Sequence, residues 1–243
     1  MRVLAIAFVY NELPYLPFAV NYYREQGCEL YVIDNYSKDG TWEWLQENKI
    51  PSHRFDSKEA FQLAWLQGEM IKTLHILKPD WFLWFAPDLF HVFDSTIYET
   101  IGLMNRAGFN LIKSPCYSIK NTGEKFGIPL QNHYGWGVVN NKVLLVGKYH
   151  EKLTISGDGV GVPDRNVFQT GVIFEYGTCK PKEVQEEKLR RREKAWTLGT
   201  PHGHGGHYRR GKELDWVYPT TYPGMEDVRQ KPELQKYLKK IIK

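Results

Sequence analysis

The sequence predicts an α/β fold in which a mostly parallel sheet carries helices on both faces. Two observations lead to this prediction. Short, almost wholly apolar runs at residues 2–9, 29–33 and 81–85 are typical of strands that are buried on both faces. Segments with the apolar spacing of helices separate these runs, and alternation of strands with helices is typical of parallel sheets.

The first predicted helices are bounded by residues with clear start or stop preferences. Residues 13–26 read as a helix with Pro14 in its first turn and Gly27 after its end. Asp39 is a good N-cap for a second helix over residues 40–48. A short strand is expected over residues 50–55.

The next helix has the clearest periodicity of the chain, over residues 58–77, with Ser57 as the expected N-cap. Its apolar positions recur at spacings of three and four, at Leu63, Leu66, Met70, Leu74 and Leu77. After the strand at 81–85, Ser95 is expected to cap a helix that runs to about residue 106. Residues 109–113 then read as a fifth strand.

The chain divides at residue 113 into a regular half, 1–113, and a less regular half, 114–243. The second half contains strand-like pieces at 137–146 and 172–176, and a charged helix at 183–196. A long loop rich in Gly and His is expected over 199–225, and a basic helix is expected to begin at Pro232. In the helix at 183–196, the side chains of Arg190, Arg191 and Arg192 read as a solvated helix face, with phosphate binding as the alternative.

The composition indicates an ordinary globular protein. The net charge of +4 is too small by itself to indicate nucleic-acid binding. Cys28, Cys116 and Cys179 are widely spaced, which favours reduced thiols and a cytoplasmic protein. No apolar run is long enough for a transmembrane segment, and no signal peptide is expected. Peripheral membrane association through the basic C-terminal helix is the alternative.

Polar residues follow three of the predicted strands, where the strands end. Tyr10, Asn11 and Glu12 follow the first strand, Asp34 ends the second, and Asp88 follows the fourth. In open α/β sheets, ligands bind at the carboxyl edge of the strands. These residues are therefore candidates for a binding site.

Three motifs resemble those of family 2 glycosyltransferases, which have the GT-A fold. They are Val9-Tyr10-Asn11-Glu12, the turn Asp34-Asn35-Tyr36-Ser37-Lys38-Asp39-Gly40-Thr41, and the strand end Phe85-Ala86-Pro87-Asp88. The resemblance is good over residues 2–95. It implies a GT-A-like, Rossmann-type sheet, with residues 1–113 as the half that binds a nucleotide-sugar and 114–243 as the acceptor half.

The resemblance also implies a donor site. It would comprise Tyr10, Asn11, Glu12, Asp34, Ser37, Asp39 and Asp88, with Tyr10, Glu12 and Asp34 holding the base and ribose. Carboxylates accept hydrogen bonds from base N–H groups and ribose hydroxyls. Ser37 and Asp39 are also ideal turn and capping residues, and Asn11 can tie the turn together, so structural roles remain open for all three.

The family's acidic D-x-D motif holds a divalent cation, Mn²⁺ or Mg²⁺, that bridges the donor diphosphate. Here that position reads Ala86-Pro87-Asp88, so one carboxylate is missing. His202, His204 and His207 in the Gly-rich loop are candidates for the missing ligand, although a loop that merely contains histidines is the alternative. Three options remain: metal binding through one carboxylate, metal-independent transfer aided by Arg or Lys, or lost activity.

Inverting transfer requires a general base that takes the proton of the acceptor hydroxyl. The candidates are Asp158 and Asp164, with Asp158 preferred, and Glu226 and Asp227 are further candidates. No flanking motif decides between them, and each is also explained as a turn residue.

The expected function is transfer of a sugar from a UDP- or GDP-sugar to an acceptor hydroxyl of a glycan or lipid-linked sugar. Two alternatives remain open. One is a non-catalytic protein that binds nucleotide or carbohydrate on a degenerate transferase fold, which the Ala86 substitution motivates. The other is a glycosyltransferase that acts on modified DNA.

Overall fold

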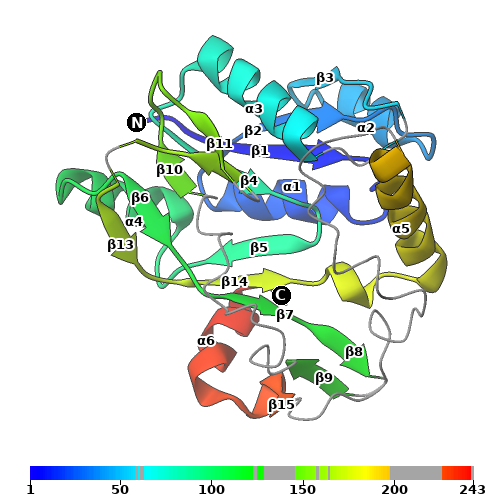
Figure 1. Ribbon diagram of the computed structural model, residues 1–243. Helices are drawn as coiled ribbons and strands as arrows, with labels where there is room; N and C mark the ends of the chain where they lie inside the picture. The colour runs from blue at the N-terminus through cyan, green and yellow to red at the C-terminus, as the bar shows by residue number, and fades with distance from the viewer. Residues whose placement is uncertain are drawn as a thin grey trace.

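The computed structural model describes residues 1–58, 60, 63–122, 125–128, 146–156, 159–163, 165–197 and 226–241. Its centre is a seven-stranded sheet with the strand order β13-β6-β10-β4-β1-β2-β3 (Figure 1). The strands of this sheet are β1 (Val3–Val9), β2 (Glu29–Asp34), β3 (Ser52–Arg54), β4 (Trp81–Phe85), β6 (Leu111–Lys113), β10 (Val146–Lys148) and β13 (Val167–Gln169).

The sheet is mixed but mostly parallel. β1 pairs in parallel with both β2 and β4, while β10 runs antiparallel to its neighbours β4 and β6. Val9 lies opposite Asp34 in the register of β1 and β2, and Ala7 lies opposite Phe85 in that of β1 and β4. The carboxyl ends of the three strands therefore meet at one edge, as predicted.

Helices cover both faces of the sheet, which confirms the predicted fold class. Alternate residues of β1 separate two hydrophobic clusters: Val3, Ala5 and Ala7 belong to one, and Leu4 and Ile6 belong to the other. The first cluster includes side chains from α1 (Leu16–Glu25), α2 (Thr41–Glu47) and α4 (Ile97–Arg106). The second cluster includes side chains from α3 (Leu63–Leu77), which lies on the opposite side of the sheet from α1 (Figure 1).

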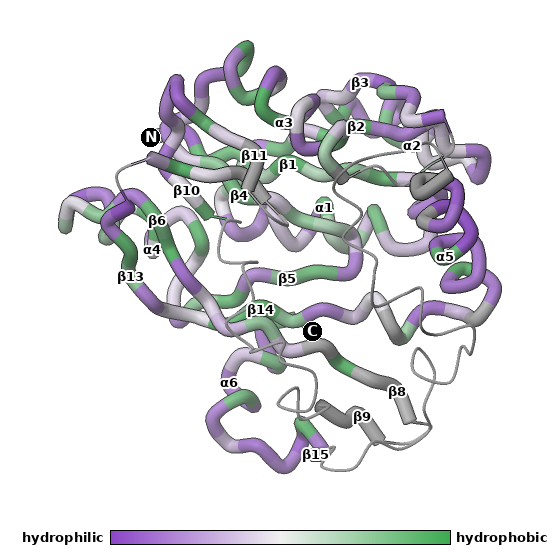
Figure 2. Tube along the Cα trace, in the orientation of Figure 1, coloured by the Kyte–Doolittle hydropathy of each residue, from purple (hydrophilic) through white to green (hydrophobic). Residues whose placement is uncertain are grey.

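A three-stranded sheet with the order β5-β14-β7 lies beside the first cluster. It consists of β5 (Leu89–Val92), β14 (Val172–Glu175) and β7 (Cys116–Ser118). Its Phe90 and Phe174 pack in the same cluster as Leu234, Leu238 and Ile241 of α6 (Pro232–Ile241). Figure 2 shows hydrophobic residues along these strands, whereas α5 (Lys182–Thr197) is largely hydrophilic.

Small elements complete the described chain. They are β8 (Lys120–Thr122), β9 (Lys125–Ile128), β11 (Thr154–Ser156), β12 (Gly159–Gly161), β15 (Glu226–Asp227) and the 3-10 helices η3 (Gly177–Cys179) and η5 (Val228–Gln230). No helix in the described ranges has the length and apolar character needed to cross a membrane.

Several predicted helix starts are wrong by a few residues. The helix predicted from residue 13 begins at Leu16, because the Glu12 carbonyl first closes a turn by accepting the amides of Tyr15 and Leu16. Pro17, rather than Pro14, lies in its first turn. α2 has Gly40 as its N-cap, with φ 92°, although the Asp39 carboxylate does accept the Thr41 amide.

Two predicted serine caps are also wrong. α4 is capped by Thr96, not Ser95, and the Thr96 hydroxyl and Glu99 carboxylate form a reciprocal capping box. Ser57 is buried and bonds with the Asn35 side chain, while residues 58 and 60 lie outside the helix α3.

β5 was not predicted. The prediction expected a helix after each strand, whereas β5 follows β4 after a tight turn in which the Leu89 amide donates to the Ala86 carbonyl. Of the strand predicted over 137–146, only residue 146 lies in the described part of the chain. The predicted loop 199–225 lies outside that part.

Candidate functional site

The turns after β1 and β2 are joined by hydrogen bonds from each turn to the other. The Asn11 amide donates to Ser37 Oγ at 2.9 Å, and the Lys38 amide donates to Asn11 Oδ1 at 2.8 Å. Asn11 has φ 53°, a left-handed conformation that Asn tolerates better than most residues. The structural role that the sequence left open for Asn11 is therefore present, and donor contact stays a prediction.

Asp39 strengthens the same junction. Its carboxylate accepts the amides of Leu13 and Thr41, each at 3.0 Å. The Thr41 hydroxyl in turn accepts the Glu12 amide at 3.1 Å. Because Ser37 and Asp39 order the backbone around Glu12, they position the candidate site whether or not they touch a ligand.

Asp34 lies at the end of β2 and is fully buried. Its two oxygens accept the Ser37 amide at 3.3 and 3.2 Å, and Oδ2 lies 3.3 Å from Arg54 Nε. Burial raises the pKa of Asp34, and the contacts with Ser37 and Arg54 oppose that rise. The Arg54 guanidinium also lies over the rings of Tyr36 and Trp42. Because the Asp34 side chain has no exposed surface, a ligand reaches it directly only if a neighbour such as Arg54 moves aside.

A buried lysine joins the ends of β1 and β4. Lys180 Nζ lies 2.7 Å from both carboxylate oxygens of Glu12 and 2.9 Å from Asp88 Oδ2. The side chain of Lys180 is 4% exposed, and that of Asp88 is 11% exposed. Lys180 follows η3 and precedes α5, so the second half of the chain supplies the partner for two predicted donor residues.

Glu12, Lys180 and Asp88 form a charged triad, in which Lys180 and Asp88 stabilise each other's charge while burial disfavours the charge of Glu12. Burial disfavours charge on Lys180, but Asp88 and Glu12 outweigh it and raise the pKa of Lys180. Burial likewise acts to raise the pKa of Asp88, but attraction to Lys180 and Lys188 lowers it overall. The pKa of Glu12 is raised, because its burial outweighs the attraction to Lys180. Lys180 and Asp88 therefore form an ion pair at neutral pH.

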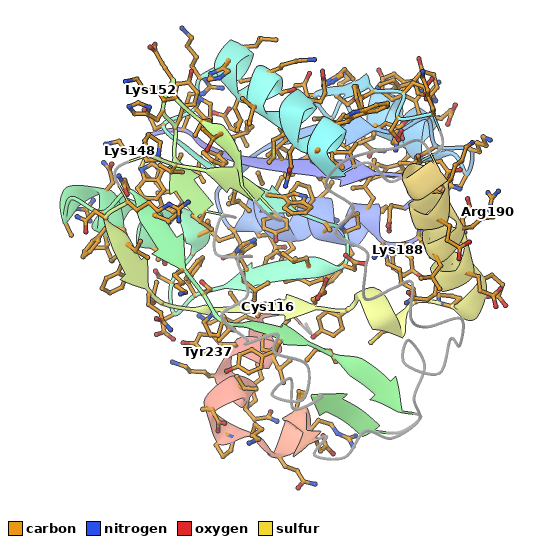
Figure 3. The ribbon with its side chains drawn as sticks, viewed as in Figure 1. Cys116, Lys148, Lys152, Lys188, Arg190 and Tyr237 are labelled. Carbon is orange, nitrogen blue, oxygen red and sulfur yellow. The ribbon has the colours of Figure 1, made fainter. Side chains whose placement is uncertain are left out.

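Helix α5 brings further basic side chains to this edge. In Figure 3, Lys188 extends from α5 toward the strands, whereas Arg190 extends from the other side of the helix. Arg190 is exposed and pairs with Glu187 at 2.8 Å. Arg191 is buried, with its guanidinium 3.5 Å from the centre of the Tyr10 ring. The interpretation of the Arg190–Arg192 run as one solvated face is therefore wrong for Arg191.

Lys180 and Lys188 were missed as site residues. Lys180 is separated from Glu12 by 168 positions, and no local motif marks it. Lys188 lies two residues before the run Arg190–Arg192, and that basic run is the signal in the sequence that points to it. Its ammonium approaches Asp88 across Gly177: a Cβ on this glycine would lie 3.2 Å from Asp88 Oδ2 and 3.8 Å from Lys188 Nζ.

The described residues do not fit a divalent cation. Of the four predicted ligands, Asp88 lies in the described part of the chain, and its carboxylate is already paired with Lys180. No cluster of three His, Cys, Asp or Glu side chains suited to a metal occurs within the described residues. The other predicted ligands, His202, His204 and His207, lie outside them.

The predicted catalytic bases Asp158 and Asp164 also lie outside the described residues. Of the two further candidates, Asp227 pairs with Arg229 at 2.8 Å and caps η5 by accepting the Arg229 amide. This arrangement gives Asp227 a structural role away from the triad.

Comparison with known proteins places the chain in a family. The family described as "Glycosyl transferase family 2" matches residues 5–214. A search of curated protein sequences found no match.

The solved structures that this chain matches include several of S. aureus TarS. The TarS 1–349 structure is 11% identical, with a TM-score of 0.48, over 100% of this chain and 80% of that chain. A second TarS structure is 12% identical, with a TM-score of 0.49, over 83% of this chain and 40% of that chain. TarS 1–349 in complex with UDP-GlcNAc is 15% identical, with a TM-score of 0.40, over 51% of this chain and 36% of that chain. This chain thus spans well under half the length of several TarS chains that it matches.

Proposed function

This chain belongs to glycosyl transferase family 2, and we propose that it transfers a sugar from a nucleotide-sugar donor to an acceptor hydroxyl. UDP- and GDP-sugars are the proposed donors. The observation that carries the proposal is the meeting of Glu12, Asp34 and Asp88 at one edge of the parallel strands, because ligands of open α/β sheets bind there.

The charge distribution at this edge supports the same proposal. Asp34 provides carboxylate oxygens at the end of β2, suited to ribose hydroxyls and base N–H groups. Lys188 provides a cation near Asp88, at the end of β4, suited to phosphate. A nucleoside diphosphate has this combination of donor groups and negative charge.

The proposed transfer proceeds with inversion. The oxygen of the acceptor hydroxyl attacks the anomeric carbon of the donor sugar, and a new C–O bond forms. The bond from that carbon to the diphosphate oxygen breaks, and its electron pair leaves with the nucleoside diphosphate. The acceptor proton passes to a carboxylate base, for which Asp158 is the first candidate and Asp164 the second.

The acceptor is proposed to be a glycan or lipid-linked sugar bound by residues 114–243. Modified DNA is a weaker alternative, since Arg190 is paired with Glu187 and Arg191 is buried against Tyr10. These two arginines are therefore not arranged as a row of phosphate contacts.

Titration calorimetry with UDP, GDP, CDP and dTDP tests the donor site first. Binding of one nucleotide and transfer of its sugar to an acceptor hydroxyl, followed by mass spectrometry, are the expected results. The anomeric configuration of the product, measured by NMR, tests inversion. Failure of all four nucleotides to bind would contradict the proposed function.

A non-catalytic binding protein is the second candidate. It is favoured by Ala86 in the position of a family carboxylate and by the pairing of Asp88 with Lys180. Binding of a nucleotide-sugar without either transfer or hydrolysis over a panel of glycan acceptors would favour this candidate over the enzyme.

A further inference from the structure

The carboxylate that remains of the family's acidic motif already has a cationic partner. Asp88 Oδ2 accepts a charge-assisted contact from Lys180 Nζ at 2.9 Å, in an environment where both side chains are largely buried. Both oxygens of Glu12 contact the same ammonium group at 2.7 Å. One ammonium therefore fills the space between the ends of β1 and β4.

A divalent cation competes poorly for this position. Mn²⁺ or Mg²⁺ bound to Asp88 would lie about 2.1 Å from its oxygen, beside the ammonium of Lys180, and the two positive charges would repel. Position 86 offers a methyl group instead of a second carboxylate. Displacing Lys180 would also strip Glu12 of its partner, and a buried unpaired charge is costly.

We propose that Lys180 takes the place of a divalent cation beside Asp88, and that Lys188 contacts the diphosphate of the donor, so that donor binding needs no metal. This inference rests on the proposed function and states which side chains balance the negative charges of Asp88 and of the donor diphosphate. The role of Lys180 is to neutralise Asp88, which would otherwise repel a diphosphate at the same strand end.

Lys188 is suited to the second role by its position. Its ammonium faces Asp88 across Gly177, where the lack of a side chain leaves the approach open. It is partly exposed, whereas Lys180 is buried, so a ligand can reach it. Arg191, stacked on Tyr10, fixes α5 over the end of β1 and so keeps Lys188 at this edge.

The test compares nucleotide binding with and without metal. The intact chain is titrated with UDP, GDP, CDP and dTDP in EDTA and again in Mn²⁺, by calorimetry. The nucleotide that binds is expected to do so with affinities that agree within about twofold in the two conditions. Direct Mn²⁺ binding is measured separately by electron paramagnetic resonance, and no tight site is expected.

Two variants test whether Lys188 contacts the phosphates of the nucleotide or only adds positive charge to this part of the protein. Lys188→Gln is expected to weaken the binding of the nucleoside diphosphate about tenfold and to leave the binding of the free nucleoside unchanged. Arg190→Gln removes a positive charge two residues away, on the other side of α5, and is the matched control. It is expected to change neither affinity.

The outcomes distinguish this inference from the function on which it rests. Binding that strengthens about tenfold or more with Mn²⁺ and is lost in EDTA would overturn the inference and leave the donor site standing. Equal weakening of nucleoside and nucleoside diphosphate by Lys188→Gln would also overturn it. If no nucleotide binds in either condition, the proposed function fails and the inference fails with it.

Discussion

Lys180 Nζ is equidistant from the two carboxylate oxygens of Glu12, at 2.7 Å each, although 168 positions separate the two residues. Glu12 follows the first strand of the sheet, and Lys180 precedes α5. The pair therefore ties the C-terminal part of the chain to the candidate donor edge. Asp88 shares the same ammonium, which makes Lys180 the common partner of two strand ends.

Removing Lys180 should destabilise the protein strongly. Lys180→Met leaves Glu12 and Asp88 without their buried partner, and breaking a buried pair in this way typically costs about 3–5 kcal/mol. Urea unfolding at pH 7 measures the loss. Lys72→Met is the control, because the pair of Lys72 with Glu69 is on the surface, where loss of one partner has little effect.

The double variant Lys180→Met with Asp88→Asn should recover part of the lost stability. It removes one of the two uncompensated carboxylates while keeping the shape of the side chain. A double variant no more stable than Lys180→Met alone would contradict the assignment of the loss to charge.

The parts of the fold that the sequence predicted depend on local patterns. β1 is apolar at every position because both of its faces are buried: Ala5 packs in one hydrophobic cluster and Ile6 in the other. α3 shows its apolar spacing because Leu66, Met70 and Leu74 are buried on one side. Such patterns report burial, so they identify elements well and element boundaries less well.

The missed features depend on contacts that local patterns do not contain. Ser95 and Thr96 are both good N-caps, and only the capping box with Glu99 selects Thr96. Lys180 is one basic residue among many in the sequence. Its role arises when the fold buries it between two distant carboxylates, which no spacing rule predicts.

His91 should make the protein less stable in mild acid. It is fully buried in β5, and its Nε2 lies 3.0 Å from the Trp84 carbonyl, so the neutral ring donates there. Burial lowers the pKa of His91 to about 4, from 6.5. The unfolded state therefore binds the proton more tightly, and stability is full above pH 6.5 and falls as the pH approaches 4.

Each unit of pKa difference corresponds to about 1.4 kcal/mol, so the total contribution is about 3 kcal/mol. Urea unfolding between pH 7.5 and 4.5 measures it. His91→Gln retains a donor for the Trp84 carbonyl but does not titrate, so its stability should fall less over this range. Identical pH slopes for the two proteins would refute the assignment to His91.

Gly171, just before β14, should not tolerate a side chain. It has φ +67°, and a Cβ there would lie 2.3 Å from the Phe93 ring and 2.7 Å from the Val92 carbonyl oxygen. Gly171→Ala should lower the free energy of unfolding by about 2–4 kcal/mol, through backbone strain and overpacking.

Gly68→Ala is the opposite case: no atom lies within 4 Å of a Cβ in the middle of α3, so stability should rise by about 1 kcal/mol. Equal effects of the two substitutions in urea unfolding would contradict this reading of Gly171.

Asp34→Asn should reduce nucleoside affinity by about tenfold or more while the fold remains intact. Asn keeps an acceptor for the Ser37 amide but loses the charge that attracts ribose or base donors. Glu29→Gln, at the opposite end of β2, is the matched control and should bind normally, since Glu29 pairs with Arg2 at the surface. Arg54→Ala uncovers the Asp34 carboxylate and should bind the nucleoside at least as tightly as the unmodified protein. Calorimetry with the free nucleoside measures all three variants, and circular dichroism checks their folding. Loss of affinity in Arg54→Ala, with normal affinity in Asp34→Asn, would mean that the nucleoside contacts the arginine instead of the carboxylate at the end of β2.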